Sequence, residues 1–373
     1  MTEIVLVFLT ALLIVVFAIP SIITVAKLKG LYDKPNERKI HANKIPRLGG
    51  LAVFIGYLLS LSVLGNLADV AGLQYLFAAF LLLFFSGLKD DIIVLSPMKK
   101  LGAQLVATGL VSVMTPVRLT NLHGVFGIAE IPLGIAIPLT MFTIIVITNS
   151  FNLIDGADGL AGALGLVMTI SFGILFALQQ EFAWSVMAFG LSGALLGFLF
   201  FNFNPAKIFM GDAGSLTTGF LLSLFAIHFI EINAPGMSPV NKFSSAPGIA
   251  IAILLVPLYD TLRVFILRTS KKKSPFEADR NHIHHWLMRI GMNHKEVSLT
   301  LTLINMAFIG VAYTLKDNPA YVVVSVIIGL ALIVGQLPVY FYRHRLSDLE
   351  ADDSALIELQ ENLRGNPENI NQD

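Results

Sequence analysis

The sequence contains no cysteine and few charged residues. Without cysteine, its 373 residues cannot form a disulfide, supply a thiolate nucleophile or bind zinc through sulfur. Charged residues make up only 13% of the chain, whereas a soluble domain carries about 25%. Since hydrophobic residues reach 55%, this scarcity of charge indicates a chain surrounded by a lipid bilayer. We expect no nucleic acid among its partners.

Apolar stretches of roughly 17–23 residues recur along the chain, the length at which a helix crosses ~30 Å of hydrocarbon. They predict an all-α integral membrane protein with about eleven transmembrane helices. The first stretch follows Glu3 without a basic segment or a cleavage site, so we interpret it as a retained span rather than a signal peptide. Residues 1–345 are then a membrane domain and 346–373 a polar tail, with a short helix-prone segment over 347–363. The expected spans are 4–26, 48–65, 71–88, 102–117, 131–149, 159–179, 183–203, 214–231, 248–267, 297–315 and 319–341.

Lysine and arginine are distributed unevenly between the two sides that these spans define. Of the 25 Lys and Arg residues, only Arg118, Lys242 and Lys316 fall on the side that carries the N-terminus. Cytoplasmic loops carry the excess of basic residues in membrane proteins. The N-terminus is therefore expected outside and the C-terminus in the cytoplasm. Nearly all of the unusual polar motifs share this cytoplasmic side, so loops far apart in sequence are expected to form one composite site.

An acidic pair closes the third expected span. Asp90 and Asp91 directly follow an apolar run, and adjacent carboxylates repel unless a divalent cation or a basic partner relieves them. Lys100 supplies a charge suited to phosphate. Both features also have plainer interpretations, the pair as a solvated helix end and the lysine as a cytoplasmic anchor. A prenyl-synthase motif would need a third aspartate where Val94 stands.

Asp155 and Asp158 belong to a second acidic motif, DGADG. Three residues apart, they are predicted to share one helix face, and Asn149 and Asn152 extend the same spacing backwards. Gly156 permits close approach of a ligand to the backbone. Polar side chains at the end of a span are costly in lipid, so function is the default interpretation. Interhelical hydrogen bonding is the alternative, and it suits the asparagines better.

Asp212 lies in a third motif, FMGDAGS, at the start of the eighth expected span. An acid near a helix N-terminus is also a good cap, so capping is the alternative to metal binding. In the functional interpretation Asp212 binds Mg²⁺, while backbone N–H groups and Ser215 face phosphate oxygens. Phe209 is a candidate for stacking on a base, with an apolar anchor as the commoner role.

A histidine cluster, His282, His284 and His285, lies in the longest basic loop. Zinc is disfavoured because no cysteine assists and the spacing matches no standard zinc pattern. Beside a diphosphate, these imidazoles and Arg280 serve better as hydrogen-bond donors or proton carriers.

Five motifs in this order resemble those of the polyprenyl-phosphate N-acetylhexosamine-1-phosphate transferases (the glycosyltransferase 4 family), over residues 1 to about 345. HIHH and PR-GG look like the N-acetylglucosamine-1-phosphate transferase (WecA/TagO-like) branch. The peptidoglycan translocase branch typically carries three consecutive histidines followed by an acid, and here Trp286 and Leu287 stand in those last two places. The motifs are Pro46–Gly50, Asp90–Asp91, Asn149–Leu160, Phe201–Ser215 and His282–His285.

The resemblance implies a reaction in which a UDP-N-acetylhexosamine and undecaprenyl phosphate give the lipid-diphosphate sugar and UMP. It implies Mg²⁺, or Mn²⁺ in its place, and a site facing the cytoplasm at the bacterial cytoplasmic (inner) membrane. A homodimer is a further expectation. Because a phosphate monoester is already largely ionised near pH 7, its second pKa being about 6, we favour direct attack on the β-phosphorus without a covalent intermediate.

The resemblance also divides the roles. Asp212 is the leading Mg²⁺ ligand, Asp90 orients the lipid phosphate and Asp91 stands beside it. Lys100, His284 and His285 would bind phosphates, and Asn202, Asp158 and Phe209 would form the nucleotide pocket. The remaining expected substrate contacts are Arg47, Asn152, Asp155, Arg280 and His282.

Two other functions fit the sequence less well. CDP-alcohol phosphotransferases need Ala-Arg after their Asp-Gly, whereas Asp155-Gly156 is followed by Ala157-Asp158. A transporter of anionic lipid-linked sugars would place its charges near the bilayer midplane, and here they gather at the ends of the spans.

Overall fold

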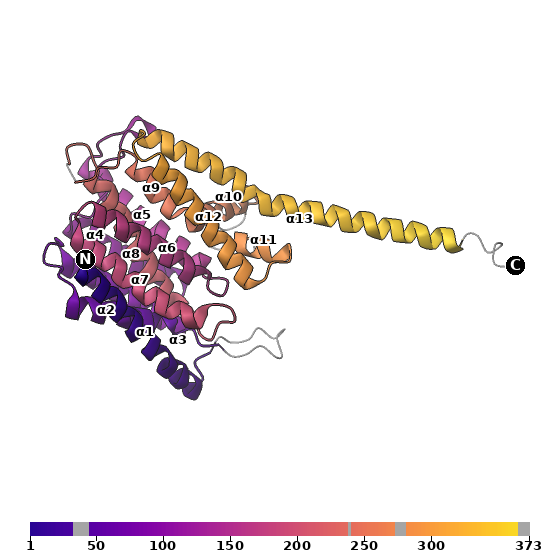
Figure 1. The fold of residues 1–373 in the computed structure, drawn as a ribbon, viewed down its shortest axis with the longest axis horizontal. Coiled ribbons are helices and arrows are strands. Elements are labelled where there is room, and N and C mark those ends of the chain that lie inside the picture. Colours follow the sequence, from indigo (N-terminus) through magenta and orange to yellow (C-terminus); the bar gives the residue numbers. More distant parts are fainter. Residues whose placement is uncertain (33–44, 238–239, 273–280, 365–373) are drawn as a thin grey trace, which may run out of the picture.

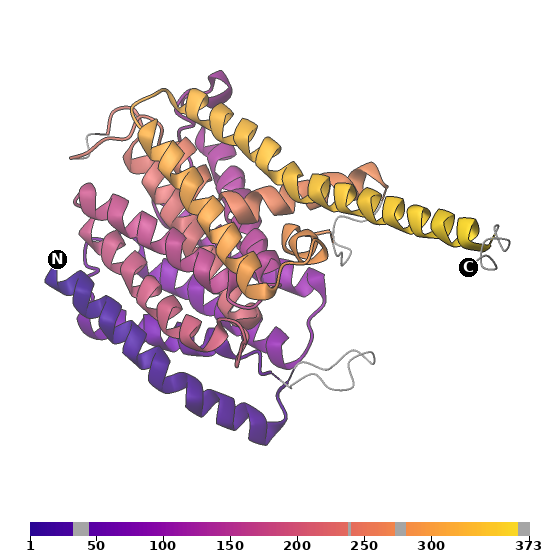
Figure 2. The ribbon, with the colours of Figure 1, turned by 45° about the vertical axis from the view of Figure 1, so that its right-hand side comes forward.

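The computed structural model describes residues 1–32, 45–237, 240–272 and 281–364, which form a bundle of α-helices (Figures 1 and 2). These described residues contain no β-strand, only an isolated bridge between Asn121 and Glu130. The predicted all-α class is confirmed. The helices are α1 Thr2–Lys29, α2 Gly49–Leu64, α3 Leu73–Ile92, α4 Pro97–Met114, α5 Leu133–Ile154, α6 Leu160–Leu178, α7 Phe182–Asn202, α8 Gly211–Ile232, α9 Ala246–Ile253, α10 Leu255–Ser270, α11 Ile283–Arg289, α12 His294–Thr314 and α13 Ala320–Arg364.

Seven of the described helices are long and apolar enough to cross a membrane, or eight if α9 and α10 form one bent span. α2 is apolar but has only 16 residues, fewer than the ~20 that a straight span needs. Charged residues lie at the end of α3 and the start of α4, neither of which is among the seven. A multi-pass membrane protein therefore follows from the structure, while the count of about eleven spans and the orientation stay predictions.

α8 is the most buried of the candidate spans and occupies the centre of the bundle. It packs against α5, α3 and α2, and α1 covers α2 and α7 on the outside (Figure 1). Small residues permit these close approaches, as they commonly do between helices in membranes. A Cβ added at Gly219 of α8, for example, would lie 2.9 Å from Cα of Thr148 in α5. The packing therefore holds the first turn of α8 at one end of the bundle, where the polar motifs gather.

The span expected to run unbroken over 248–267 is bent by 77° between α9 and α10. Pro257 has no N–H to donate to the carbonyl of Ile253, four residues earlier. Asn305 of α12 replaces that donor: its Nδ2 lies 3.0 Å from the Ile253 oxygen. Since Asn305 is fully buried, this side chain satisfies in protein a backbone group that lipid would leave unpaired.

α13 continues as one helix to Arg364, so the segment from 347 to 363 is the end of a long helix and not a separate short one. It packs beside the bundle and then projects well past it (Figure 1).

Candidate active site

Three charged side chains from three helices converge at the N-terminal end of α8. Lys100 of α4 places its Nζ 2.7 Å from Oδ2 of Asp90 and 2.5 Å from Oδ2 of Asp212. Asn152 of α5 completes the group, since its Nδ2 donates to Asp212 Oδ1 at 3.2 Å and to Ser215 Oγ at 2.7 Å. Both carboxylates keep some exposure, 14% for the side chain of Asp90 and 23% for that of Asp212, so a ligand can reach them.

The two carboxylates of this cluster are ligands of the kind that Mg²⁺ takes in proteins. Asp90 and Asp212 point one oxygen each at the same cationic group, Lys100 Nζ. Among the described residues, no group of three or more His, Cys, Asp or Glu side chains could hold a metal ion. Mg²⁺ in phosphoryl-transfer sites is commonly bound by one or two carboxylates together with substrate phosphates. The residues present therefore fit an ion that takes part of its coordination from a bound diphosphate.

Asp91 is bonded to the backbone of α8, whose first turn it caps, and not to Lys100. Its two carboxylate oxygens accept from the backbone N–H of Asp212 at 2.7 Å and of Ala213 at 2.9 Å. The first turn of any α-helix leaves such donors unpaired, and α8 has no capping side chain of its own. The two neighbouring aspartates thus face different groups, Asp90 the lysine and Asp91 the helix backbone.

The segment 46–50 runs alongside the loop that leads into α8. Phe209 donates its N–H to the Pro46 oxygen at 2.8 Å, and its own oxygen accepts from Gly49 N at 2.9 Å. Gly211 follows with a φ of 72°, and a Cβ there would lie 2.2 Å from the oxygen of Arg47. The PR-GG motif therefore positions the start of α8, and it brings Arg47 and Phe209 to the edge of the cluster.

The DGADG motif is a loop, so the prediction that Asp155 and Asp158 share a helix face is wrong. α5 ends at Ile154 and α6 begins at Leu160, with Gly159 in the left-handed region at a φ of 75°. Glycine favours such turns over a continued helix, which accounts for the break.

The two aspartates of this loop point to different partners. Burial, and after it the charge of Asp212, raise the pKa of Asp155 to about 7, against the opposing effects of Arg47 and the N–H of Gly211. Asp158 accepts instead from Asn204 Nδ2 and Ala206 N, both at 3.1 Å. Asp155 therefore belongs to the charged cluster, whereas Asp158 holds the loop before α8.

Asn202 ties the same loops together from the end of α7. It is 2% exposed, accepts from Gly159 N at 3.0 Å and donates to the Ile208 oxygen at 2.9 Å. Its expected role in a nucleotide pocket, like that of Asp158, stays a prediction.

The histidine cluster packs on the DGADG loop. A Cβ at Gly156 would lie 2.4 Å from Nε2 of His284, so only glycine fits beneath that ring. The ring of His285 lies beside that of His284, with the two ring centroids 4.2 Å apart. Burial, and after it the charge of the neighbouring His285, lower the pKa of His284 to about 3. A neutral His284 thus borders the charged cluster, while Arg280 lies outside the described residues.

Asp260 is a residue that the sequence-based prediction missed. It lies in α10, is 1% exposed, and accepts from His282 Nδ1 at 2.8 Å and from Ile283 N at 2.7 Å. An ionisable residue inside an expected span is a recognised sign of function, and Asp260 falls within 248–267. That signal was available in the sequence.

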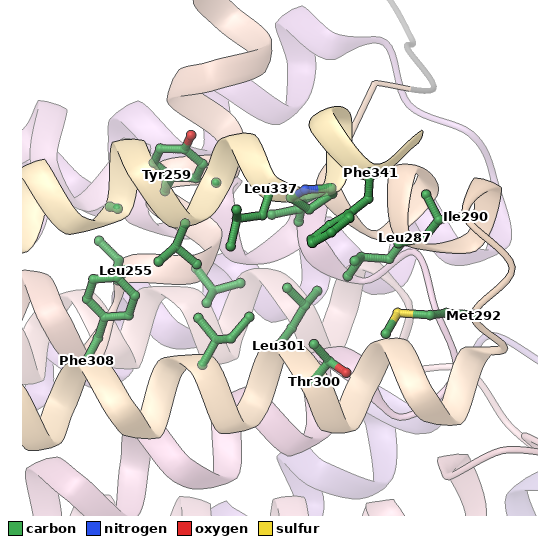
Figure 3. Close-up of a pocket in the computed structure, with 17 residues that line it drawn as sticks. Leu255, Tyr259, Leu287, Ile290, Met292, Thr300, Leu301, Phe308, Leu337 and Phe341 are labelled. Atoms are coloured by element: carbon green, nitrogen blue, oxygen red, sulfur yellow. The ribbon is translucent and has the colours of Figure 1, made fainter. Parts of the chain in front are cut away.

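An apolar cavity of about 220 Å³ is lined by residues of α10, α11, α12 and α13 (Figure 3). Leu287 and Ile283 of α11 line it, and Ile283 directly precedes His284. Leu301 and Phe308 of α12 and Phe341 of α13 contribute to its other walls, and its lining is almost entirely apolar. A hydrophobic space therefore adjoins the histidine cluster.

Known proteins resemble this chain over most of its length. Residues 73–230 match the glycosyl transferase family 4 model. A probable undecaprenyl-phosphate N-acetylglucosaminyl 1-phosphate transferase of Bacillus subtilis is 34% identical over 90% of this chain and 91% of its own. An undecaprenyl-phosphate alpha-N-acetylglucosaminyl 1-phosphate transferase of Escherichia coli K12 is 34% identical over 77% of each chain. A decaprenyl-phosphate N-acetylglucosaminephosphotransferase of Mycobacterium tuberculosis H37Rv is 32% identical, covering 89% of this chain and 87% of the relative. These matches confirm the resemblance found in the motifs.

Proposed function

Because the chain belongs to glycosyl transferase family 4, we propose that it transfers N-acetylglucosamine-1-phosphate from UDP-N-acetylglucosamine to undecaprenyl phosphate. The products are undecaprenyl-diphosphate-N-acetylglucosamine and UMP, and the step begins a cell-envelope glycan. The observation that carries this proposal is the accessible cluster of Asp90, Lys100 and Asp212, in a chain whose relatives are named for the same transfer.

In the reaction, an oxygen of the lipid phosphate bonds to the β-phosphorus of the donor. The bond from that phosphorus to the bridging oxygen breaks, and the electron pair leaves with UMP. Both partners are anions, so bringing them together and neutralising charge supplies most of the catalysis. Lys100 lies between two carboxylates and has the charge and reach to turn toward a phosphate oxygen once the substrate enters.

The carboxylates have separable roles in this proposal. Asp212 holds Mg²⁺ (Mn²⁺ can replace it), which when bound neutralises part of the diphosphate charge. Asp90 orients the lipid phosphate, and Asp91 fixes the first turn of α8 on which Asp212 stands. His284, neutral because of its burial, offers a hydrogen bond and no charge, and His285 beside it completes the phosphate contacts.

The surroundings suit a polyprenyl acceptor. The apolar cavity lined by Ile283 and Leu287 lies beside the helix that carries His284, and we assign it to the prenyl chain of the acceptor. We place the site at the cytoplasmic side of the bacterial inner membrane, in a bundle of about eleven spans. The support for this orientation is the uneven distribution of lysine and arginine.

A panel of donors tests the proposal. Purified protein in detergent, with undecaprenyl phosphate and Mg²⁺, should release UMP from UDP-N-acetylglucosamine. Release only from UDP-MurNAc-pentapeptide would assign the chain to the peptidoglycan branch, which Trp286 and Leu287 in the histidine motif argue against. Asp212→Asn should abolish release. Asp69→Asn, in the exposed turn that precedes α3 at the end far from Asp90, should leave it unchanged. Full turnover by Asp212→Asn would refute the metal assignment.

A further inference from the structure

Two amide side chains join α4 to α5 inside the bundle. Gln104 of α4 donates from Nε2 to Asn149 Oδ1 at 3.1 Å, and Asn149 of α5 donates from Nδ2 to Gln104 Oε1 at 2.8 Å. Gln104 is 3% exposed, so water competes little for these bonds. We call this pair the amide bridge, and neither of its residues belongs to the charged cluster described above.

The backbone of α5 fixes the orientation of both amides. Asn149 Nδ2 also donates to the Ile145 oxygen at 2.8 Å, and a carbonyl oxygen only accepts. The NH₂ group of Asn149 therefore faces that carbonyl, which leaves its own oxygen for the NH₂ group of Gln104. The amide bridge thus has one arrangement, and it connects a side chain of α4 to the backbone of α5.

The amide bridge lies one helical turn from the two side chains that hold Asp212. Lys100 precedes Gln104 by four residues on α4, and Asn152 comes three residues after Asn149 on α5. Residues at these spacings lie on one helix face. Lys100 pairs with Asp212 Oδ2 at 2.5 Å, and Asn152 donates to Asp212 Oδ1 at 3.2 Å. One carboxylate therefore receives a donor from each helix, and the separation of α4 and α5 determines how far apart those donors stand.

We propose that Gln104 and Asn149 are positioning residues: their amide bridge sets the separation of α4 and α5, and with it the arrangement of the two donors around Asp212. The inference rests on the proposed function for what this arrangement achieves, but not for the effect of the bridge on the helices. Residues that orient a metal-ligating side chain typically contribute about 10–100-fold in affinity or activity. Because the bridge acts one step further out, through Lys100 and Asn152, we expect a loss of about tenfold in kcat.

Apolar replacements of similar shape separate positioning from stability. Gln104→Met alone leaves the Asn149 oxygen without its donor, and losing one partner of a buried pair is costly. Combining Gln104→Met with Asn149→Leu removes both partners, which costs little stability. We expect a lowered Tm in the single variant, a Tm near that of the wild type in the double, and a kcat lowered about tenfold in both. Wild-type kcat in the double variant would make the bridge purely structural and overturn the proposal.

Exchanging the two amides tests for rescue. Gln104→Asn shortens one side of the bridge and Asn149→Gln lengthens the other, so each single variant should lower kcat. The double variant restores the combined length and should be more active than either single variant. Losses that multiply in the double variant would refute a bridge that acts as one unit.

A matched control lies at the far end of α8. Gln179, directly after α6, donates from Nε2 to Asn233 Oδ1 at 2.8 Å, and Asn233 Nδ2 donates to the Phe229 oxygen, four residues earlier, at 2.7 Å. This pair has the geometry of the amide bridge but follows the last turn of α8, whereas Asp212 lies in the first. Gln179→Met should lower the Tm and leave kcat unchanged. A comparable loss of kcat in this variant would assign the effect of Gln104→Met to stability and overturn the proposal.

Spin labels measure the separation of the helices directly and need no substrate. The chain has no cysteine, so Val106→Cys in α4 and Phe142→Cys in α5, at side chains that are each 64% exposed, create the labelling sites. In detergent, EPR should give a broader distribution of distances with Gln104→Met and Asn149→Leu than with the amide bridge intact. Identical distributions would overturn the inference even if the transferase is active. Conversely, a protein that releases no UMP from any donor, but shows this broadening, would refute the proposed function and leave the role of the bridge intact.

Discussion

Replacing Gly50 by alanine should separate two helices at the point where the site is assembled. Gly50 stands in the first turn of α2, against the first turn of α8. A Cβ built there would lie 2.1 Å from Gly214 N and 2.4 Å from Gly214 Cα, and both atoms belong to the backbone. No side-chain rotation relieves such an overlap, so one helix has to move.

The size of that movement follows from the distances. Carbon atoms in contact settle at about 3.5–4.0 Å, so α2 and α8 have to separate by roughly 1 Å. Inserting a methyl group into a well-packed core costs about 1–3 kcal/mol. The activity should fall more, because Asp212 lies in the same turn of α8 as Gly214, and a misplacement of about 1 Å at a reacting centre can cost 10²-fold in rate. We expect a Tm lowered by several degrees and a kcat lowered about 10²-fold.

Two further variants make the prediction quantitative. Gly87→Ala in α3 approaches the same turn from another side, with its Cβ 2.6 Å from Ala213 N, so its effects should be smaller than those of Gly50→Ala but in the same direction. Gly310→Ala in α12 is the control, since nothing lies within 4 Å of its Cβ. It should keep full activity and gain about 0.5–1 kcal/mol from the better helix former. The assay is UMP release with thermal unfolding in detergent. Wild-type kcat in Gly50→Ala would refute the view that the position of α8 controls the chemistry.

Three other predictions concern single contacts. Asn305→Ala removes the donor to the Ile253 carbonyl and should lower stability by about 1–3 kcal/mol, measured by thermal unfolding; an unchanged Tm would mean that the bend between α9 and α10 does not need this bond. Asp90→Asn should lose most UMP release at an unchanged Tm, and retained turnover would exclude its role at the lipid phosphate. Burial lowers the pKa of His284 to about 3, whereas the unfolded chain protonates this ring near 6.5, so the unfolded state binds more protons and stability should fall as the pH drops below 6.5. His284→Gln should weaken that dependence in unfolding measured from pH 7 to 5, and an identical pH profile would contradict it.

The sequence was informative wherever a property depended on neighbouring residues alone. Every span expected from a long apolar run contains a helix in the structure. The reason is local, since a helix satisfies its own backbone groups in lipid. The failures have non-local causes. The helix can bend between α9 and α10 because Asn305 donates to the Ile253 carbonyl, which Pro257 leaves without a donor. Asn305 lies 52 positions after Ile253, so no local pattern indicates it. The predicted helix face at Asp155 failed because the spacing was weighed above the glycines that interrupt it.

The same division holds within the site. Motifs alone brought forward Asp90, Lys100 and Asp212, and the structure shows these three in contact. What the motifs left open is the direction of each side chain. Adjacent residues on α3 point about a quarter-turn apart, since a helix advances roughly 100° per residue, and only the place of α8 determines which of Asp90 and Asp91 meets its backbone.

The start of α8 depends on contacts from several separate segments. Asp91 caps it from α3, Gly50 packs on it from α2, and the loop held by Asp158 and Asn202 leads into it. Each contact is small, but all of them fix one turn that carries Asp212. Catalysis by charge neutralisation requires such fixed positions, because charged groups that reorganise during the reaction lose much of their effect. Substitutions at this turn should therefore change kcat more than they change stability, whereas in α12, away from the cluster, the order should be reversed.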